Sequence, residues 1–406
     1  MNTATITAPK YRIAQRISRL GTETAFAVSA EAAALAKTGL RVYPFHLGDL
    51  DMKTPQNVID AAFAAANAGK TGYCPNAGIP ALREALAEDI SRSHRVPYTS
   101  DHVVIQPGGK PTIGKFIMAL MESGEEVLYP NPGYPIYESQ IEFHGGRAIP
   151  YGFREGAENF EIDLQQIEDS ITDRTRILVY NNLHNPTGAE SSLDEMHAIA
   201  ELALRHDLIV LSDEAYFDIR YQGISTSIAS LPDMAARTVI LYTFSKKFAM
   251  TGWRLGATIA PVEIASVIAK LNVNDESCPN HFIQYGAIAG LRESQHQVQQ
   301  MLETLRQRRD LAVQLLNSID GVQCYCPQAT FYLYPNVTEL MRRKGFTDYE
   351  AFRRQVLRDT GVSFCTRLHF GRAIPGESLR YIRFAYSGIP SADIEEGLGK
   401  LIDWSR

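Results

Sequence analysis

The sequence has few cysteines and no long apolar run. Met1–Lys10 lack the apolar core of a secretory signal, and no apolar run approaches the roughly 18 residues that a transmembrane helix needs. The cysteines are five in 406 residues, an odd and sparse set whose spacings match neither a disulfide framework nor a zinc site: Cys74, Cys278, Cys324, Cys326 and Cys365. We therefore expect reduced thiols, no metal centre and a soluble, cytoplasmic protein.

An excess of positive charge is also lacking, since the net charge is −6 and charged residues make up 21% of the chain. The densest basic cluster, Arg306, Arg308 and Arg309, falls in a helical pattern, and we interpret it as a solvated face. Nucleic-acid binding would need a basic face or stripe, so we expect neither nucleic acid nor a membrane as a partner. The hydrophobic share of 45% suffices for a large core and more than one domain.

Short apolar runs alternate with helical patterns through the middle of the chain. Helical periodicity covers residues 79–90 and 192–206. The apolar runs predict buried strands at Val103–Ile105, Val127–Tyr129, Ile177–Tyr180, Leu208–Leu211 and Val239–Leu241. This alternation predicts an α/β fold with a mostly parallel central sheet covered by helices on both faces.

The pattern changes after about Cys278, where one long helical stretch runs to about Ile319. Short alternating strands and helices follow, at residues 330–334, 348–358, 381–386 and 392–403. We expect a second, smaller α/β domain here, and a ligand cleft where the two domains meet.

The segment from Thr243 to Arg254 follows an apolar strand, and open α/β sheets bind ligands at that position. Hydroxyls at Thr243 and Ser245, together with Arg254, can surround a phosphate. Lys246 in such a pocket loses its proton easily enough to form an imine. Taken alone, the adjacent Lys246 and Lys247 are more typical of an exposed turn.

Two acids, Asp213 and Glu214, end the preceding strand, and Tyr216 lies just beyond them. A carboxylate that faces a cleft needs a cationic partner, which a protonated pyridine nitrogen would provide. We favour Asp213 over Glu214 for this role. The alternative is that Asp213 caps the following turn.

Two further strand ends carry turn signals. Asn185, before Pro186, offers an amide to an oxygen anion, although the Asn-Pro dipeptide also favours a plain turn. Gly108 and Gly109 link a strand to the helix that begins near Lys110. Glycines let the backbone approach an anion, and the helix N-terminus supplies free N–H groups.

In this order the motifs resemble those of the class I and II aminotransferases of the aspartate aminotransferase superfamily, which are fold-type I enzymes that use pyridoxal 5′-phosphate (PLP). The resemblance runs from about Gly48 to Arg383 and includes Gly48-Asp49-Leu50-Asp51 and Gly72-Tyr73. It implies an N-terminal segment, 1–45, that joins the small domain, a large PLP-binding domain, 46–290, and a small C-terminal domain, 291–406.

The resemblance also implies the reaction, which is transfer of an amino group from an α-amino acid to a 2-oxo acid by a ping-pong mechanism. Lys246 would hold PLP as an imine and move the substrate's proton. Asp213 would keep the pyridine nitrogen protonated, while Asn185 and Tyr216 would bond the phenolic oxygen. The phosphate would lie near Gly108, Gly109, Lys110, Thr243, Ser245 and Arg254.

Other positions complete the implied site. Tyr134 would stack on the ring, and Gly48 would line the substrate pocket. Tyr73 would reach the phosphate of a neighbouring subunit, which implies a homodimer with shared active sites. Arg383, on an alternating strand, would bind the substrate α-carboxylate through a bidentate fork. Arg380 lies three residues earlier, so on a strand it would face the other way.

Some residues depart from the family pattern. Leu183 replaces a common proline, which would loosen the loop without removing the Asn185 amide. Arg367 either meets an acidic substrate or points outward. Asp275 and Glu276 either favour a cationic substrate or belong to a solvated loop. These departures indicate opposite substrate charges, so they leave the specificity open.

Two other functions deserve comparison. The same Lys–Asp–Arg apparatus serves lyases, decarboxylases and cyclases, because the cofactor supplies the carbanion chemistry. A transcription regulator built on an aminotransferase-like domain would carry a DNA-binding domain as well. The residues before Gly48 are not notably basic and show no helix-turn-helix pattern, which argues against that reading.

Overall fold

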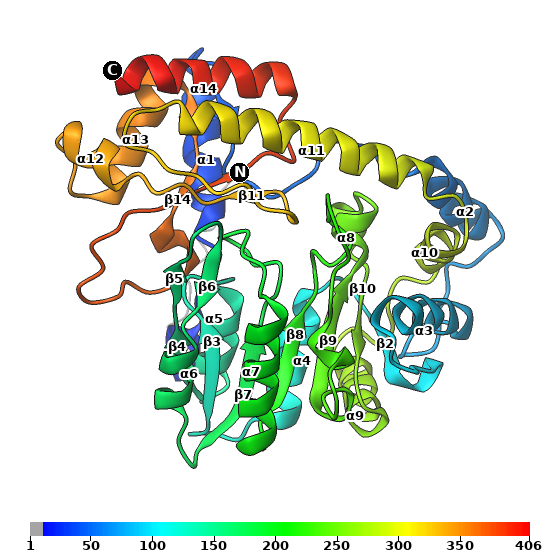
Figure 1. Cartoon of the computed structure of the whole chain (residues 1–406). Helices are drawn as coiled ribbons and strands as arrows, with labels where there is room; N and C mark the ends of the chain where they lie inside the picture. Colours follow the sequence, from blue (N-terminus) through cyan, green and yellow to red (C-terminus); the bar gives the residue numbers. More distant parts are fainter. Residues whose placement is uncertain (1–10) are drawn as a thin grey trace, which may run out of the picture.

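The computed structural model describes residues 11–406, so the prediction about a signal in Met1–Lys10 lies outside the described residues. Its centre is a seven-stranded sheet in the order β2-β10-β9-β8-β7-β3-β4 (Figure 1). β10 runs antiparallel to both its neighbours, and the other pairs are parallel. The strands are β2 Val103–Gln106, β3 Glu126–Pro130, β4 Arg147–Tyr151, β7 Thr175–Tyr180, β8 Ile209–Asp213, β9 Thr238–Thr243 and β10 Gly256–Ile259.

Both faces of this sheet are covered, because neighbouring residues of one strand enter different cores. Val127 packs with side chains of α4 (Lys110–Leu120), α5 (Ile136–Phe143) and α9 (Val262–Asn274). Its neighbour Leu128 packs with α6 (Leu164–Ser170) and α7 (Leu193–Arg205). A strand buried on both sides must be apolar at every position, which explains the continuous runs in the sequence. The predicted α/β class with a mostly parallel sheet is confirmed.

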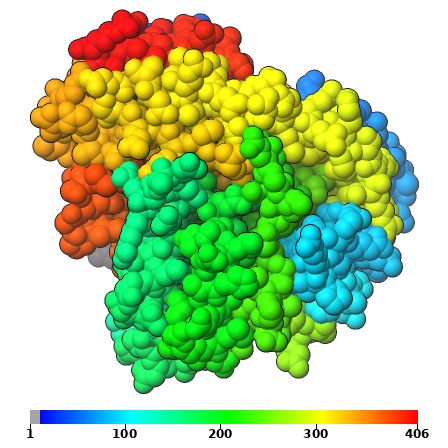
Figure 2. Space-filling model, viewed as in Figure 1, coloured from blue at the N-terminus to red at the C-terminus, as the bar shows by residue number. Residues whose placement is uncertain are grey.

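A second group of elements lies beyond the carboxyl ends of the parallel strands. Figure 2 shows the residues coloured yellow to red gathered above the green central residues. This part contains a small sheet in the order β11-β14-β13, and β1 pairs in parallel with β12. The strands are β1 Tyr43–Pro44, β11 Tyr332–Leu333, β12 Val362–Ser363, β13 Cys365–Thr366 and β14 Ile382–Ala385, and a separate hairpin joins β5 Phe153–Glu155 to β6 Phe160–Ile162.

The helix ends follow local capping rules. Ser192 and Glu195 form a capping box that starts α7, and Pro80 opens α3 at a position where its missing N–H costs nothing. The remaining helices are α1 Ala25–Ala36, α2 Gln56–Asn67, α3 Pro80–His94, α8 Phe244–Lys247, α10 Ile283–Arg292, α11 His296–Asn317, α12 Thr338–Arg343, α13 Tyr349–Thr360 and α14 Ser391–Ser405. No helix within residues 11–406 is long and apolar enough to cross a membrane.

The single helical stretch predicted from about Cys278 to about Ile319 is wrong, because it consists of two helices, α10 and α11. Glu293 ends α10 in an extended conformation. The side chain of Gln295 then donates to the free carbonyls of Gly290 (2.6 Å) and Glu293 (3.0 Å). The side-chain amide thus satisfies the helix end, and α11 can start in a new direction.

The interpretation of the basic cluster as a solvated face holds for Arg306 alone. Arg308 and Arg309 are 6% and 4% exposed. Arg308 forms a bidentate pair with Asp51 (2.8 and 2.9 Å), and Arg309 donates to the carbonyl of Pro327 (2.9 Å). The helical pattern could not reveal the burial of Arg308, because its partner Asp51 lies 257 residues away in the sequence.

The Arg308–Asp51 pair ties α11 to the segment after β1, so its loss should destabilise the protein. We expect Arg308→Met to lower the free energy of unfolding by roughly 2–3 kcal/mol, because it leaves the Asp51 carboxylate without its partner. Arg306→Met is the control and should change it by less than about 0.5 kcal/mol, as exposed pairs do. Urea unfolding followed by circular dichroism measures both, and equal effects would contradict the account.

Candidate active site

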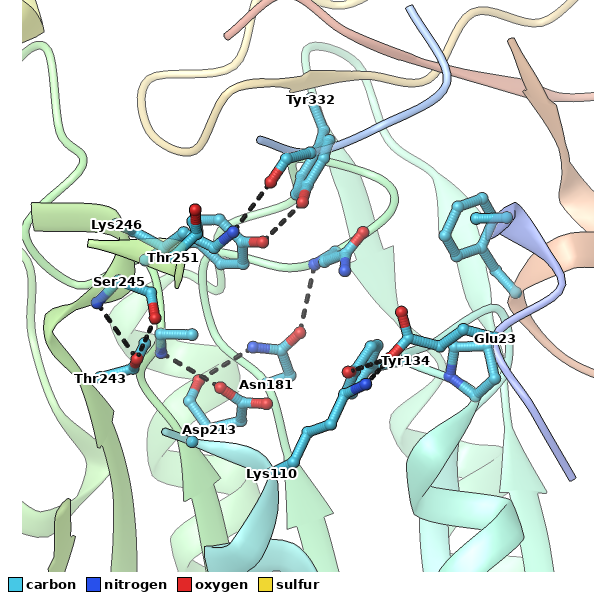
Figure 3. A pocket seen from close by; sticks show the side chains of 18 of the residues that line it. Glu23, Lys110, Tyr134, Asn181, Asp213, Thr243, Ser245, Lys246, Thr251 and Tyr332 are labelled. Carbon is cyan, nitrogen blue, oxygen red and sulfur yellow. Dashed lines mark hydrogen bonds and ion pairs between the residues drawn. The ribbon is translucent and has the colours of Figure 1, made fainter. Parts of the chain in front are cut away.

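A cavity of about 460 Å³ opens beside residues at the carboxyl ends of β7, β8 and β9 (Figure 3). Open α/β sheets bind ligands at the carboxyl ends of their strands, and the volume of this cavity is in the range of small-molecule sites. The site residues predicted from the sequence line it, except Gly108 and Tyr73. Arg383 of β14 and residues of the N-terminal segment close it from the side opposite the sheet.

Lys246 lies on α8, directly after β9, and faces the cavity. Its Nζ donates to the carbonyl of Gly48 (2.8 Å). Burial lowers its pKa to about 8, and the nearby Arg383 and Arg254 act in the same direction. Lys247 points elsewhere and pairs with Asp89 (3.2 Å) and Asp218 (3.1 Å). Of the two adjacent lysines, Lys246 is therefore the one that can offer a neutral amine to a ligand.

Asp213 ends β8 with its carboxylate in the cavity. One oxygen accepts from the Tyr137 hydroxyl and the other from the backbone N–H of Ala215 (3.1 Å). Burial raises the pKa of Asp213 to about 6. Glu214 turns away from the cavity and meets the buried His94 (2.5 Å). The choice of Asp213 over Glu214 as the acid that faces a ligand agrees with this geometry.

Asn185 and Tyr216 also face the cavity. Asn185 Oδ1 accepts from Arg383 Nη1 (3.0 Å), and its backbone N–H donates to Asn181 Oδ1 (3.1 Å). Leu183 is buried and adopts a left-handed conformation with φ of 55°. The Asn181 contact keeps the loop in place although the common proline is absent.

An anion cradle, formed by Gly109 at the start of α4 and by Thr243, Ser245 and Arg254, occupies one side of the cavity. The hydroxyls of Thr243 and Ser245 lie 2.9 Å apart. Gly108, with φ of 103°, lies beside them, and a Cβ atom there would collide with the Arg254 guanidinium. Free N–H groups, hydroxyls and a guanidinium together suit a phosphate.

The side chain of Lys110 does not point into this cradle. Its Nζ pairs with the Glu23 carboxylate and lies 5.9 Å from the centre of the Tyr134 ring (Figure 3). Tyr134 also bonds Glu23, through its hydroxyl (2.5 Å). The structure therefore favours a phosphate role for the backbone at the start of α4 and a different role for the Lys110 ammonium.

Arg383 is 4% exposed and lies between the rings of Tyr332 and Phe370, with its guanidinium carbon 4.4 Å from each ring centre. Its Nη2 donates to the carbonyl of His46 (2.7 Å), and its Nε has no partner among residues 11–406. Arg380 precedes the strand, contacts Glu377 and does not line the cavity. Arg383 is thus the arginine that the cavity can use.

Both interpretations of Arg367 are wrong. Its side chain is fully buried and donates to Glu377 (2.8 Å), so it neither points outward nor lines the cavity.

The solvated-loop interpretation fails for Glu276, whose carboxylate oxygens lie 2.6 Å from the buried ammonium of Lys115. Asp275 is exposed, and neither acid lines the cavity of this chain. Tyr73 is 90% exposed and lies outside the cavity as well.

Sequence reasoning missed several lining residues, among them Glu23, Tyr137, Asn181 and Tyr332. Tyr332 shares a hydrogen bond with Tyr216 (2.6 Å), and its ring would collide with a side chain at Gly48. Spacing could have found Tyr137, because it lies three residues after Tyr134 at the start of a helix. No local signal identifies Glu23.

The chain belongs to the family of class I and II aminotransferases, because the family model described as "Aminotransferase class I and II" matches residues 41–401. The chain is 32% identical to an aspartate aminotransferase of Bacillus subtilis (strain 168) over 364 residues, which cover 89% of the chain and 92% of the relative. It is 34% identical to a probable aspartate/prephenate aminotransferase of Aquifex aeolicus (strain VF5) over 337 residues, 82% and 85% of the two chains.

Solved structures agree. An aspartate aminotransferase from Thermus thermophilus, solved with maleate, superposes with a TM-score of 0.89 at 28% identity and covers 97% of this chain and 100% of its own. An alanine aminotransferase from Pyrococcus furiosus gives the same score and identity, with 97% and 99% covered. The chain is therefore an aminotransferase, as the motifs predicted, and these similarities favour transfer over the lyase, decarboxylase and cyclase alternatives.

The lowered pKa of Lys246 makes its reactivity testable without a cofactor. Lysines react with acylating reagents as neutral amines, so labelling of Lys246 should rise with pH around a midpoint of about 8. Lys247 is the control, because its two carboxylate partners raise its pKa and should keep it protonated. Pulse acetylation read by mass spectrometry measures both rates. A Lys246 midpoint near about 10.4, the value of a free lysine, would contradict the account.

Proposed function

We propose that this aminotransferase uses PLP, bound in the cavity around Lys246. The observation that carries the proposal is that a buried amine, a buried carboxylate and an anion cradle face one cavity. These three features match the aldehyde, the pyridine nitrogen and the phosphate of PLP.

The space around the cavity supports this fit. A side chain at Gly108 would collide with Arg254, and one at Gly48 would collide with Tyr332. Glycine at position 108 therefore leaves room for the Arg254 guanidinium of the anion cradle, and glycine at position 48 leaves room for the Tyr332 ring at the cavity. The partly unsatisfied guanidinium of Arg383 adds a buried donor for a carboxylate.

Each residue of the site then has a separate role. When bound, PLP supplies an electron sink that makes the α-carbon of an amino acid acidic. Asp213 holds a proton on the pyridine nitrogen, and Asn185 and Tyr216 bond the phenolic oxygen. Lys246, whose pKa near 8 leaves roughly a fifth of it neutral at about pH 7.4, moves the proton at the substrate α-carbon. Tyr134 stacks on the ring.

Arg383 binds the α-carboxylate of the donor and of the acceptor in turn, which suits a ping-pong mechanism with an α-amino acid and a 2-oxo acid. Its planar fork matches a carboxylate, and the rings of Tyr332 and Phe370 hold it in place. The relatives named above transfer amino groups of donors whose side chains differ, aspartate and alanine, while the α-carboxylate is common to both. Arg383 therefore accounts for the shared part of the substrate.

The domain organisation belongs to the same proposal. Residues 46–290 form the large PLP-binding domain and residues 291–406 the small domain, which the N-terminal segment joins; residues 1–10 of the predicted segment 1–45 lie outside the described residues. The parallel pairing of β1 with β12 supports this, as does the packing of Val28 on α1 against Cys365 and Phe370.

We further propose a homodimer in which Tyr73 reaches the phosphate of the neighbouring subunit. The exposed side chains of Phe63 (60%) and Tyr73 (90%) support a buried contact with a second copy. The cytoplasm is the proposed location, because all five cysteines are free thiols.

Replacing each of the two adjacent lysines tests the cofactor proposal. Lys246→Ala should abolish amino transfer and the visible absorption band of the PLP imine, because the amine that forms the imine is removed. Lys247→Ala should retain both, since Lys247 pairs with Asp89 and Asp218 outside the cavity. Absorbance after PLP reconstitution and a coupled assay report the two properties. Retention of the band by Lys246→Ala would refute the assignment.

Asp213→Asn tests two effects of the buried carboxylate: how much it destabilises the cofactor-free protein, and how much it contributes to PLP binding. Its pKa in the folded protein, near 6, exceeds the ordinary value of 3.8, so the protonated form favours folding below pH 3.8 and this contribution is lost as the pH rises through 6. The uncharged variant should therefore stabilise the cofactor-free protein by roughly 2–3 kcal/mol at about pH 7, and by less as the pH falls toward about 4.5.

The same variant should bind PLP more weakly, because it cannot hold the charged pyridine nitrogen. Thermal unfolding with and without PLP measures both effects. A variant that is less stable without PLP at about pH 7 than the wild type would contradict the burial argument.

A further inference from the structure

The N-terminal segment forms one wall of the cavity. On one side Gly21 N–H donates to Ser139 Oγ on α5 (3.0 Å). On the other, Val28 on α1 packs against Phe370. Between these anchors Glu23 and Phe26 turn toward the cavity. The wall is thus fixed to both parts of the molecule.

The Glu23 carboxylate holds two neighbouring side chains of this wall. The same oxygen, Oε1, accepts from the Tyr134 hydroxyl (2.5 Å) and pairs with Lys110 Nζ. Figure 3 shows the three side chains together, on the side of the cavity away from Lys246. The side chain of Glu23 is 18% exposed and that of Lys110 is 46% exposed, so the carboxylate is shielded from water more than the ammonium is.

A substrate bound as proposed above directs its own side chain toward this wall. The α-carboxylate of the substrate lies on Arg383 and its amino group lies near Lys246. The remaining substituent of the α-carbon that varies between substrates, the side chain, then faces Glu23, Phe26 and Tyr134. Among the other cationic residues lining the cavity, Arg254 belongs to the anion cradle. Burial lowers the pKa of His369, which therefore stays neutral near pH 7.

Lys110 is then the cation that remains for a second carboxylate on the substrate, and Glu23 already neutralises it. A second carboxylate would have to approach Lys110 beside the Glu23 carboxylate. Like charges within a few ångströms oppose binding, whereas a neutral side chain meets the aromatic surface of Phe26.

We propose that Glu23 is a specificity-determining residue that selects amino donors with a neutral side chain and rejects those with a second carboxylate. The inference rests on the proposed function, since Arg383 must hold the α-carboxylate. It predicts a donor preference that differs from the aspartate after which those relatives are named.

Binding of unreactive carboxylates to the PLP-loaded enzyme tests this without turnover. Calorimetry compares maleate, a dicarboxylate, with 4-methylpentanoate, a monocarboxylate with a neutral chain. The wild type should bind maleate at least about tenfold more weakly. Glu23→Gln frees Lys110, so maleate should bind about tenfold more tightly while 4-methylpentanoate changes less than about threefold.

Two further variants control for charge and for Lys110. Glu138→Gln removes a carboxylate that pairs with Arg372 outside the cavity, and should change neither affinity. Adding Lys110→Met to Glu23→Gln should remove the gain for maleate.

The outcomes are distinguishable. Tighter binding of maleate than of 4-methylpentanoate by the wild type would overturn the role of Glu23, and this comparison needs no variant. An unchanged maleate affinity in a folded Glu23→Gln would overturn it too. Failure of the wild type to bind either ligand would instead contradict the role of Arg383 in the proposed function.

Discussion

The site depends on the burial of one amine, the Nζ of Lys246, away from water. Lys246 donates to a backbone carbonyl, Gly48 O, rather than to a carboxylate, so burial acts on its pKa without a direct counter-ion. Lys247, the next residue, pairs with two carboxylates and stays charged. One step along α8 turns the side chain by about a quarter of a circle, which suffices to separate a reactive amine from a structural one.

The fold buries Lys246 by covering the carboxyl ends of the central strands. Asn181, Asp213 and Thr243 lie where β7, β8 and β9 end, so an open sheet edge would expose them to solvent. Arg383 and Tyr332 from the small sheet, and Gly48 from the N-terminal part, cover the edge. The electrostatics of the cavity therefore require chain segments from both ends of the sequence. A buried carboxylate, Asp213, and a buried amine can share the cavity because covering it excludes water from both.

The sequence predicts what depends on local pattern. Continuous apolar runs identified five of the seven central strands and missed β4 and β10. Polar residues that end or follow the predicted strands, such as Asp213 and Lys246, lie at the cavity as expected. Long-range pairing escaped that reasoning. Arg308 looked solvated because its partner Asp51 is 257 residues away, and Glu23 carried no signal because Tyr134 is 111 residues away. A sequence shows which charged side chains need a partner, but it does not show where in the folded protein that partner lies.

Substrate charge illustrates the same limit. Arg367 and the Asp275–Glu276 pair were the sequence candidates for contacting the substrate, but none of them lines the cavity: Arg367 Nε donates to Glu377, and Glu276 pairs with Lys115. The cavity wall instead carries the Glu23–Lys110 pair. An ion pair in the cavity wall neutralises the cation that could bind a side-chain carboxylate of the substrate. The residue that neutralises this cation therefore affects specificity as much as the cation itself does.

Reductive labelling tests the central claim most directly. The protein is loaded with PLP, reduced with borohydride and digested, and the modified peptide is sequenced by mass spectrometry. The account predicts one phosphopyridoxyl group per chain, on Lys246. Labelling of Lys247 or Lys110 in place of Lys246, or no stable label after loading, would contradict it.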